Sequence, residues 1–108
     1  MQAADLLQLQ AQVQAIHASE ALIRYLQDLL AATRSGQWFE QGLCPRAGVG
    51  ILRAAKARAL LAEREFVTPD DVQAILPQTA AHRLTPVSHA GRGALEQVRA
   101  MMAAVVLA

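Results

Sequence analysis

Apolar residues recur at intervals of three and four through most of the chain, which is the spacing of one face of an α-helix. The predicted helices cover residues 5–17, 19–35, 45–63, 69–76 and about 93–105. We expect Pro77 to end the fourth helix, after which residues 78–84 can add one or two helical turns. The apolar positions are Leu6, Leu9, Val13, Ile16, Leu22, Leu26, Leu29, Thr33, Ile51, Leu52, Ala55, Ala59, Leu60, Val72, Ile75, Leu76, Leu95, Val98, Met102 and Val105.

Residues at the predicted helix ends support these bounds. Asp5, followed three residues later by Gln8, has the spacing of a capping box. Ser19 can cap the second helix with its hydroxyl, and Pro45 suits the first position of the third because its φ is fixed and it lacks an N–H group. The clearest start is residues 68–71, Thr-Pro-Asp-Asp, where a hydroxyl cap and a proline precede two carboxylates at the positive end of the helix dipole.

Residues 36–43 interrupt the helical pattern and are predicted to form a loop. Gly36 is placed to end the second helix in the left-handed conformation. Trp38 and Phe39 are expected to hold this loop against the bundle.

Composition agrees with a single helical domain over residues 1–108. Hydrophobic residues make up 54% of the chain but aromatic residues only 4%, so the core has to be aliphatic and rich in alanine. Such a core suits close helix packing and offers little to a β-sandwich, whose strands favour aromatic and β-branched residues. No strand pattern, internal repeat or long linker is found. We therefore predict an all-α fold, a compact bundle of about five helices.

Charge and cysteine content narrow the partners and the compartment. The net charge is +1, too small to predict nucleic acid or an acidic membrane as partner. The single Cys44 cannot form an internal disulfide and fits a reducing compartment. No stretch reaches the ~18 apolar residues of a membrane span, and residues 1–20 lack the pattern of a signal peptide. A soluble, cytoplasmic protein is expected.

The motifs of several catalytic sites are missing from the sequence. No phosphate-binding loop of the G-x-x-x-x-G-K-[ST] type and no G-x-G-x-x-G segment occurs. The three histidines and Cys44 do not have the spacing of metal ligands. Cys44 next to a helix start could have a lowered pKa, but a capping position is favoured over a nucleophile because no histidine is near in sequence. No catalytic residue and no metal site are predicted for this chain.

Four segments in a fixed order resemble the C-terminal lid of MoxR-family AAA+ ATPases. They are Ala32-Thr33-Arg34, Gly42-Leu43-Cys44-Pro45-Arg46-Ala47 followed by an alanine-rich helix, and Arg64-Glu65-Phe66-Val67-Thr68-Pro69-Asp70-Asp71-Val72 with Ala81-His82-Arg83-Leu84. The resemblance covers about residues 17–85, whereas residues 86–108 match less well. The lid of magnesium-chelatase ATPase subunits is the nearest competing family.

The resemblance implies that Arg46 is the sensor 2 residue, which reaches the γ-phosphate of ATP, with Pro45 and Ala47 completing the motif. The position agrees with the chemistry, because free N–H groups and the dipole at a helix start favour an anion and a guanidinium matches phosphate oxygens. An exposed or salt-bridged arginine is the alternative. Arg53 and Lys56, near the same face, could help to bind phosphate or a neighbouring subunit, although a solvated basic face is favoured.

The family also implies the partners of a longer protein. They are a preceding ATPase core that binds ATP and Mg²⁺, neighbouring subunits of a hexameric ring, and a von Willebrand factor A domain protein. The implied activity is chaperone-like remodelling, with no catalysis by this chain alone. Two other functions compete: a free-standing helical adaptor that binds a protein through residues 93–108, and a small DNA-binding protein, which the near-neutral charge disfavours.

The sequence departs from the family pattern at several positions of the third helix. Cys44 replaces the usual serine, and because a thiol is a poor cap, Cys44→Ser is expected to stabilise the chain. Glu63 replaces a glycine, so either the helix ends differently or Glu63 takes an unfavourable positive φ. Gly48 and Gly50 lower helix propensity and indicate close approach by another backbone or by nucleotide, or a loosened helix start.

Overall fold

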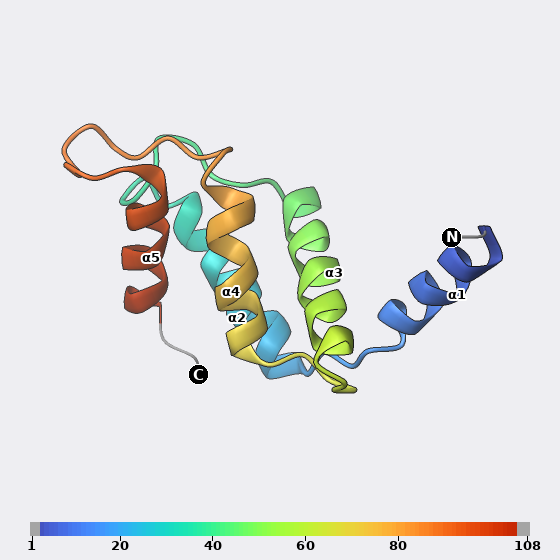
Figure 1. The fold of residues 1–108 in the computed structure, drawn as a ribbon. Helices are drawn as coiled ribbons and strands as arrows, with labels where there is room; N and C mark the ends of the chain where they lie inside the picture. Colours follow the sequence, from blue (N-terminus) through green and yellow to red (C-terminus); the bar gives the residue numbers. More distant parts are fainter. Residues whose placement is uncertain (1–2, 106–108) are drawn as a thin grey trace.

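The computed structural model describes residues 3–105, and most of them lie in five helices (Figure 1). These are α1 (Ala3–Gln14), α2 (Glu20–Thr33), α3 (Pro45–Leu61), α4 (Pro69–Ala80) and α5 (Ala94–Ala104). Within residues 3–105 there is no strand, only isolated bridges that pair His17 with Phe66 and Phe39 with Pro86. The predicted all-α bundle of five helices is confirmed. Residues 106–108, part of the tail assigned to the adaptor hypothesis, lie outside the described residues.

Four of the helices form the bundle, and α1 stands apart from it. α4 lies between α3 and α5, and α2 packs against all three (Figure 1). α1 leaves the bundle at the end where α2 begins, and among the described helices it approaches α3 alone. No described helix is long and apolar enough to cross a membrane.

The core is aliphatic and alanine-rich, as the composition predicts. The stripe of α2 faces it, and alanines of α3 allow α2 and α4 to approach closely. Phe39 is fully buried, and Trp38 packs beside the core, so both aromatic residues hold the loop as expected. The largest fully buried side chains are Phe39, Leu29, Ile51, Leu76, Met101, Val72, Val98, Thr33 and Asp71.

The ends of α1 and α2 agree with the sequence only in part. The Ser19 hydroxyl accepts a hydrogen bond from the Leu22 N–H group at 3.1 Å, which confirms the predicted cap. The capping box at Asp5 is wrong, because the helix already includes Ala3 and Asp5 lies within its first turn. Gly36 has the expected positive φ of 82°, but α2 has ended three residues earlier, with Arg34 at its C-cap.

α4 runs through Pro77 to Ala80, so Pro77 does not end the helix and the helical turn expected after it belongs to α4 itself. A proline inside a helix removes one backbone hydrogen bond and crowds the preceding turn. Here Leu76, Pro77 and Ala80 are all buried, and the Ala81 N–H group donates to the Pro77 carbonyl at 3.1 Å. Burial of this apolar face outweighs the lost bond.

The buried face of α5 is rotated from the predicted one. Leu95 is 41% exposed, whereas Gln97, Val98 and Met101 are buried. The Gln97 side-chain amide donates a hydrogen bond of 2.8 Å to the carbonyl of Trp38, which attaches α5 to the loop before α3. Gln97 is buried in place of Leu95 because the loop supplies a hydrogen-bond acceptor for its side-chain amide.

Candidate functional site

The N-terminal end of α3 presents Arg46 to solvent. Cys44 is the N-cap, with φ −79° and ψ 163°, and Pro45 occupies the first turn. Ala47 is buried against the bundle, whereas Cys44, Pro45 and Arg46 are exposed. The structure thus brings the three predicted motif residues, Pro45 to Ala47, together on one turn at a helix start.

A network behind this turn holds the loop that leads into α3. The Thr33 hydroxyl donates to the Leu30 carbonyl at 2.6 Å and accepts from the Leu43 N–H group at 3.0 Å. Leu43 is itself buried one residue before the cap. The end of α2 thereby fixes where α3 begins.

Glycines at positions 42 and 48 allow the start of α3 and the loop before it to lie close to α2. A Cβ at Gly42 would lie 2.6 Å from the Arg34 Cα and 2.7 Å from its backbone nitrogen, so only glycine fits there. A Cβ at Gly48 would lie 2.5 Å from a methyl group of Leu30, so the close neighbour is a side chain of α2 and not the backbone that was expected. Nothing lies within 4 Å of a Cβ at Gly50, so that glycine has no such reason.

Arg46 has no counter-ion in the described part of the chain. Within residues 3–105 no carboxylate forms an ion pair with it and no side-chain hydrogen bond engages it. The salt-bridged alternative is therefore excluded for this part of the chain. Arg53 lies further along α3, where it faces α1, and Lys56 is half-buried.

The lowered pKa of Cys44 reflects the electrostatics of the first turn of α3. The thiol makes no capping hydrogen bond, yet the first-turn N–H group of Ala47, above all, lowers the pKa of Cys44 below its ordinary value. The N–H group and positive charge of Arg46 act in the same direction. The turn therefore favours negative charge, as expected of a helix start.

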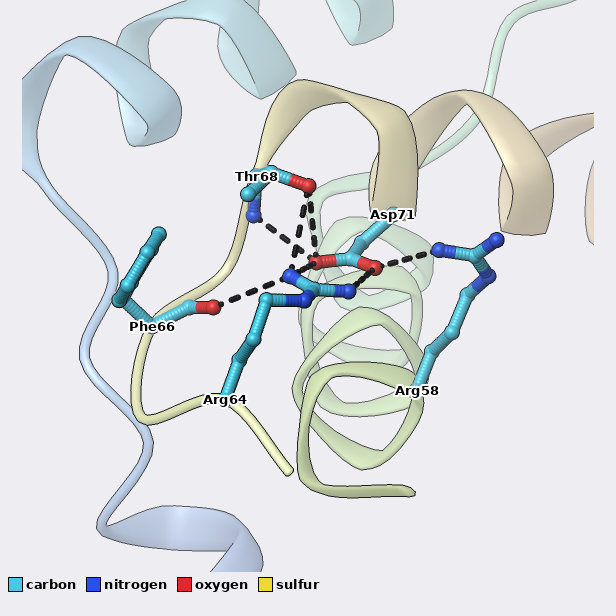
Figure 2. A network of polar contacts seen from close by, with 5 residues as sticks. All are labelled: Arg58, Arg64, Phe66, Thr68 and Asp71. Atoms are coloured by element: carbon cyan, nitrogen blue, oxygen red, sulfur yellow. Dashed lines mark hydrogen bonds and ion pairs between the residues drawn. The ribbon is translucent and has the colours of Figure 1, made fainter. Parts of the chain in front are cut away.

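A second polar cluster lies at the other end of α3, where the chain turns into α4 (Figure 2). One oxygen of the fully buried Asp71 carboxylate accepts from Arg58 at 2.6 Å and from Arg64 at 2.7 Å. The other accepts from Arg64 at 2.7 Å and from the Thr68 N–H group at 2.9 Å. We call Arg58, Arg64, Thr68 and Asp71 the α3–α4 clamp.

The clamp shifts the ionisation of its members in the directions expected for a buried ion pair. The hydrogen bonds from Arg64, first of all, hold the pKa of Asp71 far below its usual range, against the opposing effect of burial. The same interaction raises the pKa of Arg64. Arg58 and Arg64 keep 45% and 27% of their side chains exposed, so only the carboxylate is fully removed from water.

Glu63 connects α3 to the clamp with a positive φ of 60°. The N–H group of Arg64 then donates back to the Ala59 carbonyl at 2.9 Å, closing the helix end. Of the two alternatives for this position, the unfavourable φ is the one adopted. A glycine-type helix end is thus kept without glycine, and it directs Arg64 toward Asp71.

The ion pairs of the clamp were not anticipated from the sequence. Thr68 and Asp71 have the spacing of a capping box, and that signal was available. Arg58 is 13 residues from Asp71, and nothing in the periodic pattern indicates that their side chains converge.

The remaining candidates do not form a site. Among residues 3–105 no group of histidine, cysteine or carboxylate side chains has the arrangement of a metal site. His82 and Arg83 are exposed, and Arg83 lines a shallow polar depression with Glu40, Gln41 and Thr85. Two places in the described part of the chain combine charged side chains with hydrogen-bonding groups. They are the first turn of α3 and the α3–α4 clamp.

Comparison with known proteins gives a family match over most of the chain. A family model described as the AAA lid domain matches residues 31–103. YeaC of Bacillus subtilis is 35% identical over 80 residues, the chaperone MoxR1 of Mycobacterium tuberculosis 35% over 89, and protein MoxR of Paracoccus denitrificans 39% over 94. These matches cover 74%, 74% and 73% of this chain but 25%, 24% and 28% of the relative. The chain therefore spans about a quarter of the length of the curated relatives it matches.

A solved structure has the same fold. The crystal structure of a Cytophaga hutchinsonii protein described as an ATPase superposes with a TM-score of 0.88 at 23% identity. The match covers 97% of this chain and 36% of the other. At this identity the likeness establishes the fold.

Proposed function

Because the chain belongs to the AAA lid domain family and is related to MoxR proteins, we propose that it senses ATP bound to an AAA+ core through Arg46. In this proposal Arg46 is the sensor 2 residue and contacts the γ-phosphate. Loss of that phosphate on hydrolysis removes the contact and lets the lid move relative to the core. Pro45 starts the helix and Ala47 seats it on the bundle, so both position Arg46.

The observation that carries the proposal is an exposed guanidinium, without an ion pair among residues 3–105, at the start of a helix whose first turn already favours negative charge. Other exposed arginines, such as Arg24, also lack an ion pair, so the place of Arg46 in the first turn of α3 is what distinguishes it. Arg46, at the positive end of the α3 dipole, suits a phosphate group. It is the part of an ATP site that this chain contributes, and the core would supply the other contacts and the ligands of Mg²⁺.

The wider assembly follows from the family and belongs to the same proposal. The core domain is the first partner, and neighbouring subunits of a ring, in a hexamer, are the second. The remodelling of protein complexes in a chaperone-like manner, with a von Willebrand factor A domain protein, is the proposed cellular activity. The lid alone does not hydrolyse ATP in this scheme, and family membership favours it over a free-standing adaptor.

The test is ATP hydrolysis by the full-length protein that contains this chain. A charge-assisted hydrogen bond contributes about 1.5–3 kcal/mol, so Arg46→Ala should lower kcat/KM for ATP by about 10- to 100-fold. Arg46→Lys should keep part of the activity, because the charge remains but the fork of donors is lost. Arg24→Ala, which removes an exposed arginine from α2, is the matched control. Equal activity of Arg46→Ala and Arg24→Ala would refute the sensor assignment.

A further inference from the structure

The apolar face of α1 is covered only in part by the bundle, on the side that approaches α3. Its three members on one side are Leu6, Leu9 and Val13, of which Leu6 is 47% and Leu9 41% exposed. No residue of α1 is buried. A helix of 12 residues is marginal in water without tertiary contacts, so an apolar stripe on such a helix indicates a missing partner.

The base of α1 is nevertheless held in place. Ile16, two residues after the helix, is buried in the core. The His17 N–H group donates to the Glu65 carbonyl at 2.9 Å, and the Val67 N–H group donates to the His17 carbonyl at 2.9 Å. The chain is therefore fixed to the α3–α4 loop just after α1, and the helix extends away from the bundle from this point (Figure 1).

The composition of α1 suits a buried interface. Asp5 is the one charged residue of the 12, and the others are aliphatic residues and glutamines. Interface cores are depleted of charged side chains in the same way. Beside the helix lies an open groove of about 450 Å³, whose lining consists of Leu9, Gln10, Val13, Gln14 and Arg53.

The solved relative shows that this arrangement is not particular to one chain. The superposition covers 97% of the present chain, so it includes α1, while the present chain covers only 36% of the other. That longer chain therefore has a large part outside the shared fold. The curated relatives are about four times as long as their matched part.

We propose that the apolar face of α1, formed by Leu6, Leu9 and Val13, docks on the ATPase core of the same polypeptide. The inference rests on the proposed function, since it takes the chain to be the lid of a longer ATPase. A covalently linked partner fits the size of the face. Three side chains offer far less than the ~1,000 Å² of an independent interface, but a tether raises the effective concentration of the partner.

Docking at α1 gives the core a mechanical connection to α3. The His17 bonds join the base of α1 to the loop that contains Glu65 and Val67, and this loop lies within the turn that the α3–α4 clamp closes. Movement of the core against α1 is thus passed to α3, the helix that carries Arg46.

Hydrogen–deuterium exchange of residues 3–14, without nucleotide, tests the docking. In the full-length protein these amides should exchange at least about tenfold more slowly than in the 108-residue chain, because docking suppresses fraying of the helix. The pair Leu6→Glu and Leu9→Glu should abolish that protection. The matched pair Gln8→Glu and Ala11→Glu adds the same charge at the same spacing on exposed positions away from the stripe, and should preserve it.

Two results would overturn the proposal. One is equal exchange of residues 3–14 in the full-length protein and the 108-residue chain. The other is a concentration-dependent dimer of the 108-residue chain, seen by sedimentation, that Leu6→Glu with Leu9→Glu abolishes, because the occupant would then be a second copy. Arg46→Ala should leave the protection intact. A failed sensor 2 test with α1 still protected, or the reverse, therefore separates this proposal from the function on which it rests.

Discussion

Two residues at the ends of α3 occupy backbone positions that their side chains do not suit. Cys44 has the extended conformation of an N-cap but offers a thiol where a hydroxyl would accept a hydrogen bond. Glu63 has a positive φ, which costs an L-residue about 1–2 kcal/mol. Each position lies beside one of the two polar sites, and a single substitution at each can test the effect of the backbone conformation on stability.

At the start of α3, Cys44→Ser should raise the melting temperature by about 2–6 °C, because serine supplies the missing cap without a change of shape. Cys44→Ala should give no increase, since it removes the thiol without adding an acceptor. Thermal unfolding followed by circular dichroism measures both. An equal effect of the two substitutions would show that the gain does not come from capping.

At the end of α3, Glu63→Gly should increase the free energy of unfolding by about 0.5–1 kcal/mol. Relief of the positive φ stabilises the folded state, and the greater freedom of glycine in the unfolded chain offsets part of that gain. Glu63→Ala keeps the unfavourable φ and removes the same charge, so it serves as the control. Urea denaturation of both variants would contradict the prediction if alanine stabilised as much as glycine.

Among the elements, α3 and α4 are joined by a polar contact inside an otherwise apolar interface. The alanine face of α3 permits close packing but makes no directional bond. The Asp71 carboxylate, with all of its acceptor capacity in use, sets how far α4 lies along α3. The pairing therefore defines the geometry of the α3–α4 corner in a way that aliphatic contacts alone would not.

For this corner, Asp71→Asn should lower the stability at pH 7 by about 2–3 kcal/mol, because it leaves Arg58 and Arg64 without their carboxylate and both can regain only part of their hydration. The effect should depend on pH. The folded state holds the pKa of Asp71 well below the ~3.9 of an unfolded chain, so the wild-type advantage is complete above about pH 5 and declines as the pH falls below about 4.

Asp70→Asn removes the same charge from the neighbouring, exposed position and is the control for Asp71→Asn. Urea denaturation between pH 3 and pH 7 should show a small and nearly constant effect for that variant. A loss for Asp71→Asn that stays the same at pH 3 would mean that the ionised carboxylate is not what stabilises the corner.

The whole molecule consists of a bundle that contains the core and a helix that contributes little to it. No side chain of α1 is buried, whereas Ile16, just after it, belongs to the core. The bundle therefore provides most of the stability of the fold, and α1 provides the proposed docking surface. The bundle supports Arg46, and α1 is available to a partner.

Removal of residues 1–14 should consequently lower the free energy of unfolding by less than about 1 kcal/mol, since little apolar area is exposed by it. Ile16→Ala in the intact chain should cost about 2–3 kcal/mol, because a buried isoleucine leaves a cavity. Denaturant unfolding of the two variants compares the parts directly. A larger loss from the deletion than from Ile16→Ala would place α1 within the cooperative core.

The sequence by itself determined the features that depend on neighbours along the chain. The positions of the helices, the Ser19 cap and Pro45 at the start of α3 are local, and each agrees with the structure. The place of Arg46 in the first turn follows from Pro45 beside it. The family resemblance rests on the same short segments, and comparison with known proteins agrees with it.

Tertiary structure decided everything that depends on which surfaces meet. α4 continues through Pro77 because the face that carries Leu76, Pro77 and Ala80 is buried. α5 buries Gln97 because the carbonyl of Trp38 accepts its hydrogen bond. The convergence of Arg58 and Arg64 on Asp71, and the exposure of an apolar stripe on α1, have the same origin. A side chain's partner across the fold depends on packing between distant segments, and local sequence periodicity carries no information about that.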